Sequence, residues 1–434
     1  MSTPSPTRTT PAATLSWRVV PPLVSTALIY IGSGVLSTLL PLRFSALGLS
    51  PGAIGLLATF EALGFLVGCL YAHKVIRPVG LERAYAAFAA MKAVAILSLH
   101  FASWIPALAL ARFLIGLNAA GLSVIVESWL NALVANELRG RLLTIYVLVI
   151  GLFFGVGQLM GEHLLVTGPE LLFIAGIATT LALVPLAGIN VRAPESSRKV
   201  RLDVLTALRT SPASVLACLL NGLVLTAFLT VGPLFGERIG LSQGQIIQLM
   251  ACVSLGGLFL QWPIGYLSDK IDRLYALIGL GIGTLAVSAL LASVTGQTPF
   301  IVLALAFAVF GGVTESLYAM GVAHANDRAR SNDHVALSSS LLFVWSIGAA
   351  IGPTTGSLVI QMTVPQAFFV YAGALALAYT LVGLWRLSRR PKFTPGDPRE
   401  EFHSYPHTSP EVYTWAPYHM DTISEPPPSE AADG

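Results

Sequence analysis

The sequence is poor in charged side chains and in cysteine. Only 11% of its 434 residues are Asp, Glu, Lys or Arg, against about 25% in an ordinary soluble domain. The sequence also lacks a Gly-Lys-Ser/Thr nucleotide loop and an HExxH metal motif. Its three cysteines, Cys69, Cys218 and Cys252, lie inside apolar runs, so we expect neither a disulfide framework nor a metal site. These absences argue against an enzyme, against a resident cofactor and against chemistry driven by ATP.

Long hydrophobic runs fill the chain instead. Hydrophobic residues make up 54% of it, and the mean hydropathy is +0.73. The formal charge of +3 does not indicate a nucleic-acid partner, because the basic residues form no run. A helix needs roughly 20 apolar residues to cross a hydrocarbon core of about 30 Å. On this criterion we expect twelve spans, with approximate limits 18–44, 51–75, 81–103, 105–131, 139–166, 169–191, 213–237, 243–268, 273–295, 298–325, 333–361 and 365–388.

Polar segments divide the chain into two blocks. Residues 1–17 form an N-terminal tail, and the hydrophobic segment after them is too long for a signal-peptide core. The longest internal loop, 192–212, separates a six-span block at 18–191 from a second one at 213–388. From residue 389 to 434 the chain is polar and holds nine of the 27 prolines, so we expect a disordered tail.

The basic residues are distributed unevenly between alternate loops. Of the 25 Lys and Arg residues, 21 lie in the termini or in the loops after even-numbered spans. Loops rich in Lys and Arg stay in the cytoplasm. We therefore expect a multi-pass protein of the inner membrane of a bacterium-like cell, with both termini in the cytoplasm.

The two blocks share an internal repeat. Residues 39–55 align with residues 231–247 at an offset of 192, which matches Gly48 with Gly240 among other identities. Parallel repeats of six spans with a binding site near the midplane recur in membrane transporters. The repeat therefore favours two similar bundles that enclose a cavity.

A loop motif follows the second span of the second block. The stretch GYLSDKIDR, residues 265–273, resembles the loop signature of the major facilitator superfamily, with a glycine, an acid four residues later and basic residues beside it. The resemblance implies a conformational latch formed by Gly265, Asp269, Lys270 and Arg273. Asp272 occupies the position of the signature's second glycine.

Further strings carry the same resemblance over about residues 18–390. Arg112 and Gly116 in ARFLIG are similar to the Arg and Gly motif of the superfamily's fourth span. The strings most similar to its YcaD-type branch are VESWLN (126–131), RGRLL (139–143), LQWPIG (260–265) and SLYAMGVAHANDR (316–328). The resemblance implies an all-α membrane protein with twelve transmembrane helices in two pseudo-symmetric six-helix bundles. In that fold, spans 3, 6, 9 and 12 lie outside and the other eight line the cavity.

Several polar residues lie at one depth in the expected spans. At 1.5 Å per residue, Glu61 lies about 15 Å from the start of its helix, near the midplane. Glu315 falls slightly deeper, toward the cytoplasm. Polar groups gathered at one depth are what a midplane site requires. The other candidates for the cavity lining in this layer are Tyr30, Asn118, Asn221 and Trp345.

The two deepest acids need a compensating charge or a proton, since an isolated charge in this medium costs roughly 2.5 kcal/mol or more. Lys92 and Arg112 are both candidate partners of Glu61, because either side chain lies within reach of its depth. Such a pair is either structural or part of the transport cycle. Away from their ends, the second block's spans hold no Lys or Arg to neutralise Glu315, so we expect that acid to carry a proton. Either this proton takes part in coupling, or the acid is hydrogen-bonded and never titrates.

A third acid, Glu127, lies near the cytoplasmic end of its span. Arg139 and Arg141 follow across a short loop. We expect a surface ion pair that anchors this loop.

The sequence thus favours a monomeric secondary transporter that moves a small solute by alternating access, with proton coupling through Glu61 or Glu315. A cavity with few fixed charges suggests a largely apolar or singly charged solute. Two alternatives remain. One is a facilitator without a coupled ion. The other is a sensor or receptor that has lost transport and uses the tail after Arg389 to bind a partner.

Overall fold

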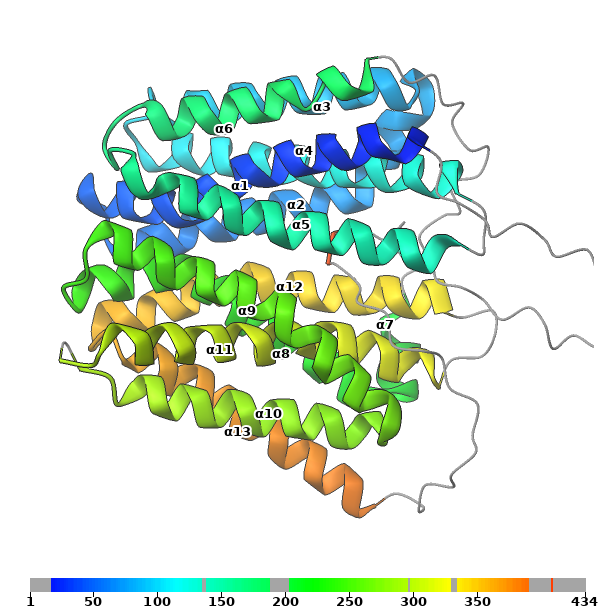
Figure 1. Cartoon of the computed structure of the whole chain (residues 1–434), viewed down its shortest axis with the longest axis vertical. Helices are drawn as coiled ribbons and strands as arrows, with labels where there is room; N and C mark the ends of the chain where they lie inside the picture. Colours follow the sequence, from blue (N-terminus) through cyan, green and yellow to red (C-terminus); the bar gives the residue numbers. More distant parts are fainter. Residues whose placement is uncertain are drawn as a thin grey trace, which may run out of the picture.

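Helices account for the described secondary structure of the chain. The computed structural model describes residues 17–134, 138–187, 203–295, 297–328, 334–389 and 407–408, and within these ranges it contains no β-strand. The helices lie side by side along a common direction (Figure 1). Their bounds are α1 Val20–Ala46, α2 Pro51–Val79, α3 Leu81–Ser98, α4 Ile105–Leu133, α5 Arg139–Met160, α6 Glu170–Leu181, α7 Val204–Thr210, α8 Pro212–Arg238, α9 Gln243–Lys270, α10 Arg273–Ala292, α11 Phe300–Asn326, α12 His334–Met362 and α13 Ala367–Ser388.

Ten helices among the described residues are long and apolar enough to cross a membrane, and α3, α6 and α7 are not among them. α3 stops at Ser98, five residues before the expected limit, and it carries three charged side chains. α6 stops at Leu181 and is followed by a 3-10 turn at Val184–Leu186. The chain is therefore a multi-pass membrane protein.

The segment 192–212, expected as a loop between the blocks, contains a short helix. α7 begins after Asp203, whose carboxylate accepts hydrogen bonds from the backbone N–H and the hydroxyl of Thr206 at 2.9 and 2.7 Å. An Asp at this position caps a helix N-terminus. The sequence prediction missed this helix because it spans only 7 residues. Residues 188–202 lie outside the described part.

The repeated segment forms the same turn in both halves. Gly48 and Gly240 have φ values of +84° and +83°, a conformation that favours glycine. Two residues later, Ser50 and Ser242 cap α2 and α9 by accepting hydrogen bonds from backbone N–H groups in the first turn. The sequence repeat at an offset of 192 therefore corresponds to a repeated local structure.

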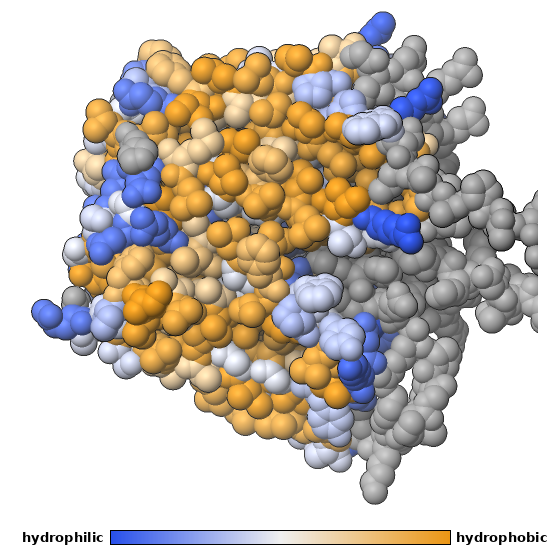
Figure 2. Space-filling view, viewed as in Figure 1, coloured by the Kyte–Doolittle hydropathy of each residue, from blue (hydrophilic) through white to orange (hydrophobic). Residues whose placement is uncertain are grey.

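Four helices lie at the two edges of the molecule. Figure 1 shows α3 and α6 at one edge and α10 and α13 at the other, with the remaining long helices between them. The face where α1 begins and α13 ends is called the terminal face below, and the opposite one is called the distal face. On the side of the molecule shown in Figure 2, apolar side chains cover most of the described surface between these faces, while hydrophilic residues gather toward the helix ends. This distribution fits a protein surrounded by lipid.

Hydrogen bonds join the two halves near the distal face. The backbone N–H of Gly52, at the start of α2, donates to Gln361 near the end of α12 at 2.7 Å. Two turns into α2, the hydroxyl of Thr59 lies 2.8 Å from that of Thr354. Ser45 at the end of α1 donates to Glu237 at the end of α8 at 2.8 Å. These contacts close the distal side of the interface between the halves.

Candidate functional site

Glu61 of α2 forms an ion pair with Arg112 of α4. The Arg112 side chain is 13% exposed and that of Glu61 is 33% exposed, so the pair is only partly withdrawn from its surroundings. Of the two partners that the sequence allowed, the structure selects Arg112. A carboxylate in the membrane thus gains a full countercharge and a charge-assisted hydrogen bond.

Glycine brings the two helices close enough for this pair. A Cβ atom at Gly116 would clash with the backbone carbonyl of Glu61, and one at Gly64 would clash with that of Phe113. Helices with small residues at the contact can approach until their backbones touch. Arg112 lies one turn before Gly116, so this approach places its guanidinium beside the Glu61 carboxylate.

Lys92, the other candidate partner of Glu61, forms its hydrogen bond elsewhere. The Lys92 side chain is 2% exposed, and its ammonium donates to the hydroxyl of Ser33 in α1 at 3.4 Å. It still interacts electrostatically with Glu61. Arg112 reaches the carboxylate because α2 and α4 approach closely at Gly64 and Gly116.

One face of α2 runs from Glu61 toward the terminal face. Phe65 and Cys69 follow at intervals of four residues, so the three side chains share a stripe. The ring of Phe65 packs edge-on against Trp345 of α12, with centroids 6.5 Å apart, and the Cys69 thiol lies 3.8 Å from the carbonyl of Thr408. Glu61 therefore belongs to a stripe that faces the second half of the molecule.

Trp345 and Asn221 form the centre of the site in the second half. The indole N–H of Trp345 donates to the side-chain oxygen of Asn221 at 2.7 Å, and the Asn221 amide donates to the carbonyl of Thr314 in α11. Both side chains are buried. The structure thus brings together two residues that the sequence placed at the same depth, and it holds the indole in one orientation.

The other two residues of the predicted layer lie apart from this pair. The Asn118 amide donates to the carbonyl of Leu114 at 2.6 Å, so it is used within its own helix. The Tyr30 hydroxyl lies beside Ser123 and near Glu127, toward the terminal face. No contact with Trp345 is found for either residue within the described part of the chain.

Glu315 of α11 lies against α9. Its side chain packs over Gly257, where a Cβ atom would clash with the Glu315 methylenes. Within the described part of the chain, Glu315 has neither an ion pair nor a hydrogen bond. Tyr318 follows one turn later and packs edge-on against Trp345, with centroids 6.2 Å apart. Glu315 therefore lies one helical turn from a residue of the aromatic centre that the Glu61 stripe faces.

The expected surface position of Glu127 is wrong. Its side chain is fully buried and accepts a hydrogen bond from the hydroxyl of Tyr146 in α5 at 2.9 Å. It also accepts one from the hydroxyl of Thr408. Arg141 is exposed and Arg139 is partly buried. Glu127 lies inside the protein, where the Tyr146 hydroxyl reaches its carboxylate from α5.

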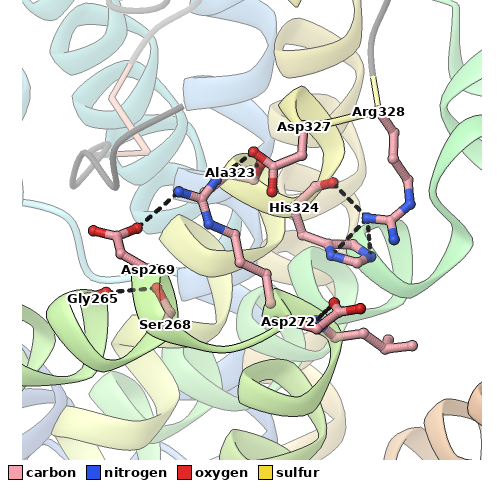
Figure 3. A network of polar contacts seen from close by, with 10 residues as sticks. Gly265, Ser268, Asp269, Asp272, Ala323, His324, Asp327 and Arg328 are labelled. Carbon is pink, nitrogen blue, oxygen red and sulfur yellow. Dashed lines mark hydrogen bonds and ion pairs between the residues drawn. The ribbon is translucent and has the colours of Figure 1, made fainter. Parts of the chain in front are cut away.

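The loop motif after the second span of the second half forms a charged network (Figure 3). Arg273 at the start of α10 is 2% exposed and forms ion pairs with Asp327 at 2.7 Å and Asp269 at 3.0 Å. It also donates to the carbonyl of Ala323 at 3.2 Å. The network ties together the terminal-face ends of α9, α10 and α11.

The other two motif residues contribute locally. The ammonium of Lys270 lies 4.2 Å from the ring centroid of Tyr266. The carbonyl of Gly265 accepts a hydrogen bond from Ser268 at 2.7 Å (Figure 3). Asp272, in the position of the motif's second glycine, caps α10 by accepting from the backbone N–H of Leu274 at 2.8 Å. Arg273 is therefore the residue on which this motif depends.

Two residues of the C-terminal segment expected to be disordered lie between the halves. The ring of His407 stacks on Trp345 at a centroid distance of 4.3 Å and packs edge-on against Tyr318 at 5.6 Å. In Figure 1 the short red segment at this position lies between α5 and α12. The rest of residues 390–434 lies outside the described part. Composition alone did not reveal these contacts, since the surrounding tail reads as polar.

Comparison with known proteins identifies the family. A family profile described as Major Facilitator Superfamily matches residues 23–312 and 237–418. The chain therefore belongs to the major facilitator superfamily, as the sequence motifs indicated.

Individual relatives agree with this result. The chain is similar to the MFS-type transporter YcaD of Shigella flexneri, with 29% identity over 375 residues, or 84% of this chain and 94% of YcaD. YcaD of an Escherichia coli strain matches over the same shares.

The fold is shared with solved transporter structures. The nucleoside transporter NupG superposes with a TM-score of 0.72 at 11% identity, covering 86% of this chain and all of NupG. A bacterial homologue of the human lysosomal transporter Spinster, in an inward-facing and occupied conformation, superposes with a TM-score of 0.65 at 14% identity. It covers 87% of this chain and 98% of the homologue. At these identities the likeness establishes the fold.

Proposed function

We propose that the protein is a proton-coupled secondary transporter of the bacterial inner membrane, which moves a small solute by alternating access. In this proposal twelve helices cross the membrane as two pseudo-symmetric bundles, and both termini lie in the cytoplasm. The observation that carries the proposal is the contact of the Glu61 stripe with Trp345, whose ring also packs against Tyr318, one helical turn from Glu315. Acidic side chains at membrane depth mark solute and proton pathways.

Glu315 is the preferred proton carrier. Apolar surroundings disfavour a charged carboxyl, and Glu315 has no cation partner within the described part of the chain. A proton on this carboxyl removes the charge, and release of the proton restores it. Its position one helical turn from Tyr318, which packs against Trp345, would let solute binding and proton binding influence each other.

Glu61 has a different role in this proposal. Arg112 already neutralises it, so protonation is not needed for its stability. A partly exposed ion pair can open when a solute with one charge binds to either partner. We therefore assign Glu61 and Arg112 to solute recognition or to helix packing, and Glu315 to coupling.

The described contacts suit an inward-facing state. The hydrogen bonds between the halves lie near the distal face, which the basic residues assign to the outside. The terminal half would then open to the cytoplasm. Rocking of the two bundles around the midplane site is the alternating-access movement of this architecture.

A ligand screen followed by transport tests the proposal. Solutes are first ranked by the increase in thermal stability that they give the purified protein at several pH values. The strongest ligand is then used for uptake by proteoliposomes with an imposed pH gradient. Accumulation driven by the gradient supports the proposal. Counterflow exchange that is insensitive to pH would instead favour an uncoupled facilitator.

A further inference from the structure

His407 and Thr408 occupy a surface built from both halves of the protein. Glu127 and Cys69 belong to the first half, whereas Tyr318 and Trp345 belong to the second. All four side chains are buried, with exposures of 0%, 8%, 1% and 6%. The contacts lie roughly 9 to 16 Å from the terminal ends of α4, α2, α11 and α12 by helical rise. They therefore lie nearer the terminal face than Glu61 and no deeper than Glu315.

The surface offers two kinds of recognition. Trp345 presents the face of its ring to the imidazole of His407, and Tyr318 packs against the imidazole from another side. Glu127 offers a carboxylate oxygen to the hydroxyl of Thr408. Both elements are held in place by other contacts, because Asn221 fixes the indole and Tyr146 donates to the carboxylate.

We propose that Glu127, Tyr318 and Trp345 form a ligand site for a planar ring next to a hydroxyl donor, and that His407 and Thr408 of the same chain occupy it. The tail is then an internal competitor of any solute with this chemistry. His407 and Thr408 also bridge the two halves and obstruct the terminal side of the route to Glu61 and Glu315. Only this competition with a transported solute rests on the proposed function.

Acid would weaken this docking. Enclosure between the halves lowers the pKa of His407 to about 4, because the charged imidazolium loses its hydration there. The titratable groups around the docked segment are Cys69 from α2, Glu127 from α4, Tyr146 from α5 and Tyr318 from α11. Since a free histidine has a pKa of about 6.5, docking is complete above that pH and is lost progressively as the pH falls toward 4.

Alkylation of Cys69 tests the docking in the full-length chain without any transport assay. The carbonyl of Thr408 lies 3.8 Å from this buried native thiol, so N-ethylmaleimide should label it slowly in the wild type. In the His407→Ala/Thr408→Val variant we expect about tenfold faster labelling, because a stacking contact and a hydrogen bond to a carboxylate are lost. Labelling is quantified by mass spectrometry, with the buried Cys218 as the internal control.

A peptide of residues 402–413 then serves as the probe. Added to the double variant, it should restore the slow labelling of Cys69, and the same peptide with both residues changed should not. Thr408→Ser in the full chain keeps the hydroxyl and should keep the protection. Equal labelling rates in the wild type and the double variant, or failure of the peptide to protect, would overturn the proposal. Because no flux is measured, this outcome is independent of the coupling mechanism.

Discussion

The Arg112 guanidinium of α4 pairs with the Glu61 carboxylate of α2, although Lys92 of α3 lies near the same acid. By their depth along the helices, both Lys92 and Arg112 could have paired with Glu61. The choice depends on the close approach of α2 and α4 at Gly64 and Gly116. Lys92 instead donates to Ser33 and supports Glu61 from a greater distance.

Removal of one partner of this pair should destabilise the protein. Breaking a fully buried pair costs about 3 to 5 kcal/mol, and we expect about 1 to 3 kcal/mol for Arg112→Gln because part of the pair is exposed. Thermal unfolding of purified protein measures the effect. Glu61→Gln/Arg112→Gln should recover part of the loss. A variant Arg112→Gln as stable as the wild type, with a much less stable Lys92→Met, would reverse the assignment.

The network at the terminal ends of α9, α10 and α11 should depend on Asp327 more than on Asp269. Both acids bind Arg273, but the Asp327 side chain is 14% exposed and that of Asp269 is 38% exposed. Exposed pairs contribute about 0 to 1 kcal/mol, so Asp269→Asn should cost less than Asp327→Asn. Lys270→Met, which leaves these pairs intact, is the control. Equal thermal midpoints for Asp269→Asn and Asp327→Asn would show that exposure does not decide how much each ion pair contributes to stability.

A methyl group between α2 and α4 should be poorly tolerated. Gly116→Ala places a Cβ atom against the backbone of Glu61, and overpacking of this kind costs about 1 to 3 kcal/mol. Gly279→Ala is the matched control, because a Cβ atom there meets nothing within 4 Å. The control should be neutral or slightly stabilising in thermal unfolding, since Ala favours a helix over Gly by about 1 kcal/mol. Equal losses for both variants would contradict the close approach.

The protection of Cys69 by the tail should depend on pH. Docking favours the neutral imidazole of His407, so it should weaken about tenfold between pH 7.5 and pH 5.5. The ratio of the Cys69 labelling rate in the double tail variant to that in the wild type measures docking at each pH. It cancels the intrinsic pH dependence of thiol alkylation. His407→Phe keeps a ring without a titrating group, so its protection should not change, and a similar pH dependence in that variant would exclude His407 as the titrating group.

The sequence predicted much of the fold because apolar runs of membrane length are a strong signal. Ten of the expected spans correspond to helices of that length, and the repeated glycines Gly48 and Gly240 form the same turn. The sequence missed α7, whose 7 residues carry no such signal. The sequence also overestimated the lengths of α3 and α6, because apolar residues continue past the end of each helix.

The residues of the candidate site were predicted from their depth in the membrane. Depth does not determine the side of the helix on which a side chain lies. Asn221 and Trp345 share a depth and are in contact, whereas Asn118 shares it and bonds within its own helix. Phe65 and Tyr318 were missed, although each lies one helical turn from a predicted acid. The docking of His407 and Thr408 could not be predicted, because it depends on a surface that exists only after both halves have folded.

The uptake of solute by proteoliposomes containing Glu315→Gln tests the central claim most directly. Glutamine keeps the shape of a protonated carboxyl but cannot release a proton. The account predicts that this variant still exchanges the solute in counterflow and no longer accumulates it when a pH gradient is imposed. Accumulation equal to that of the wild type would show that Glu315 does not carry the coupled proton.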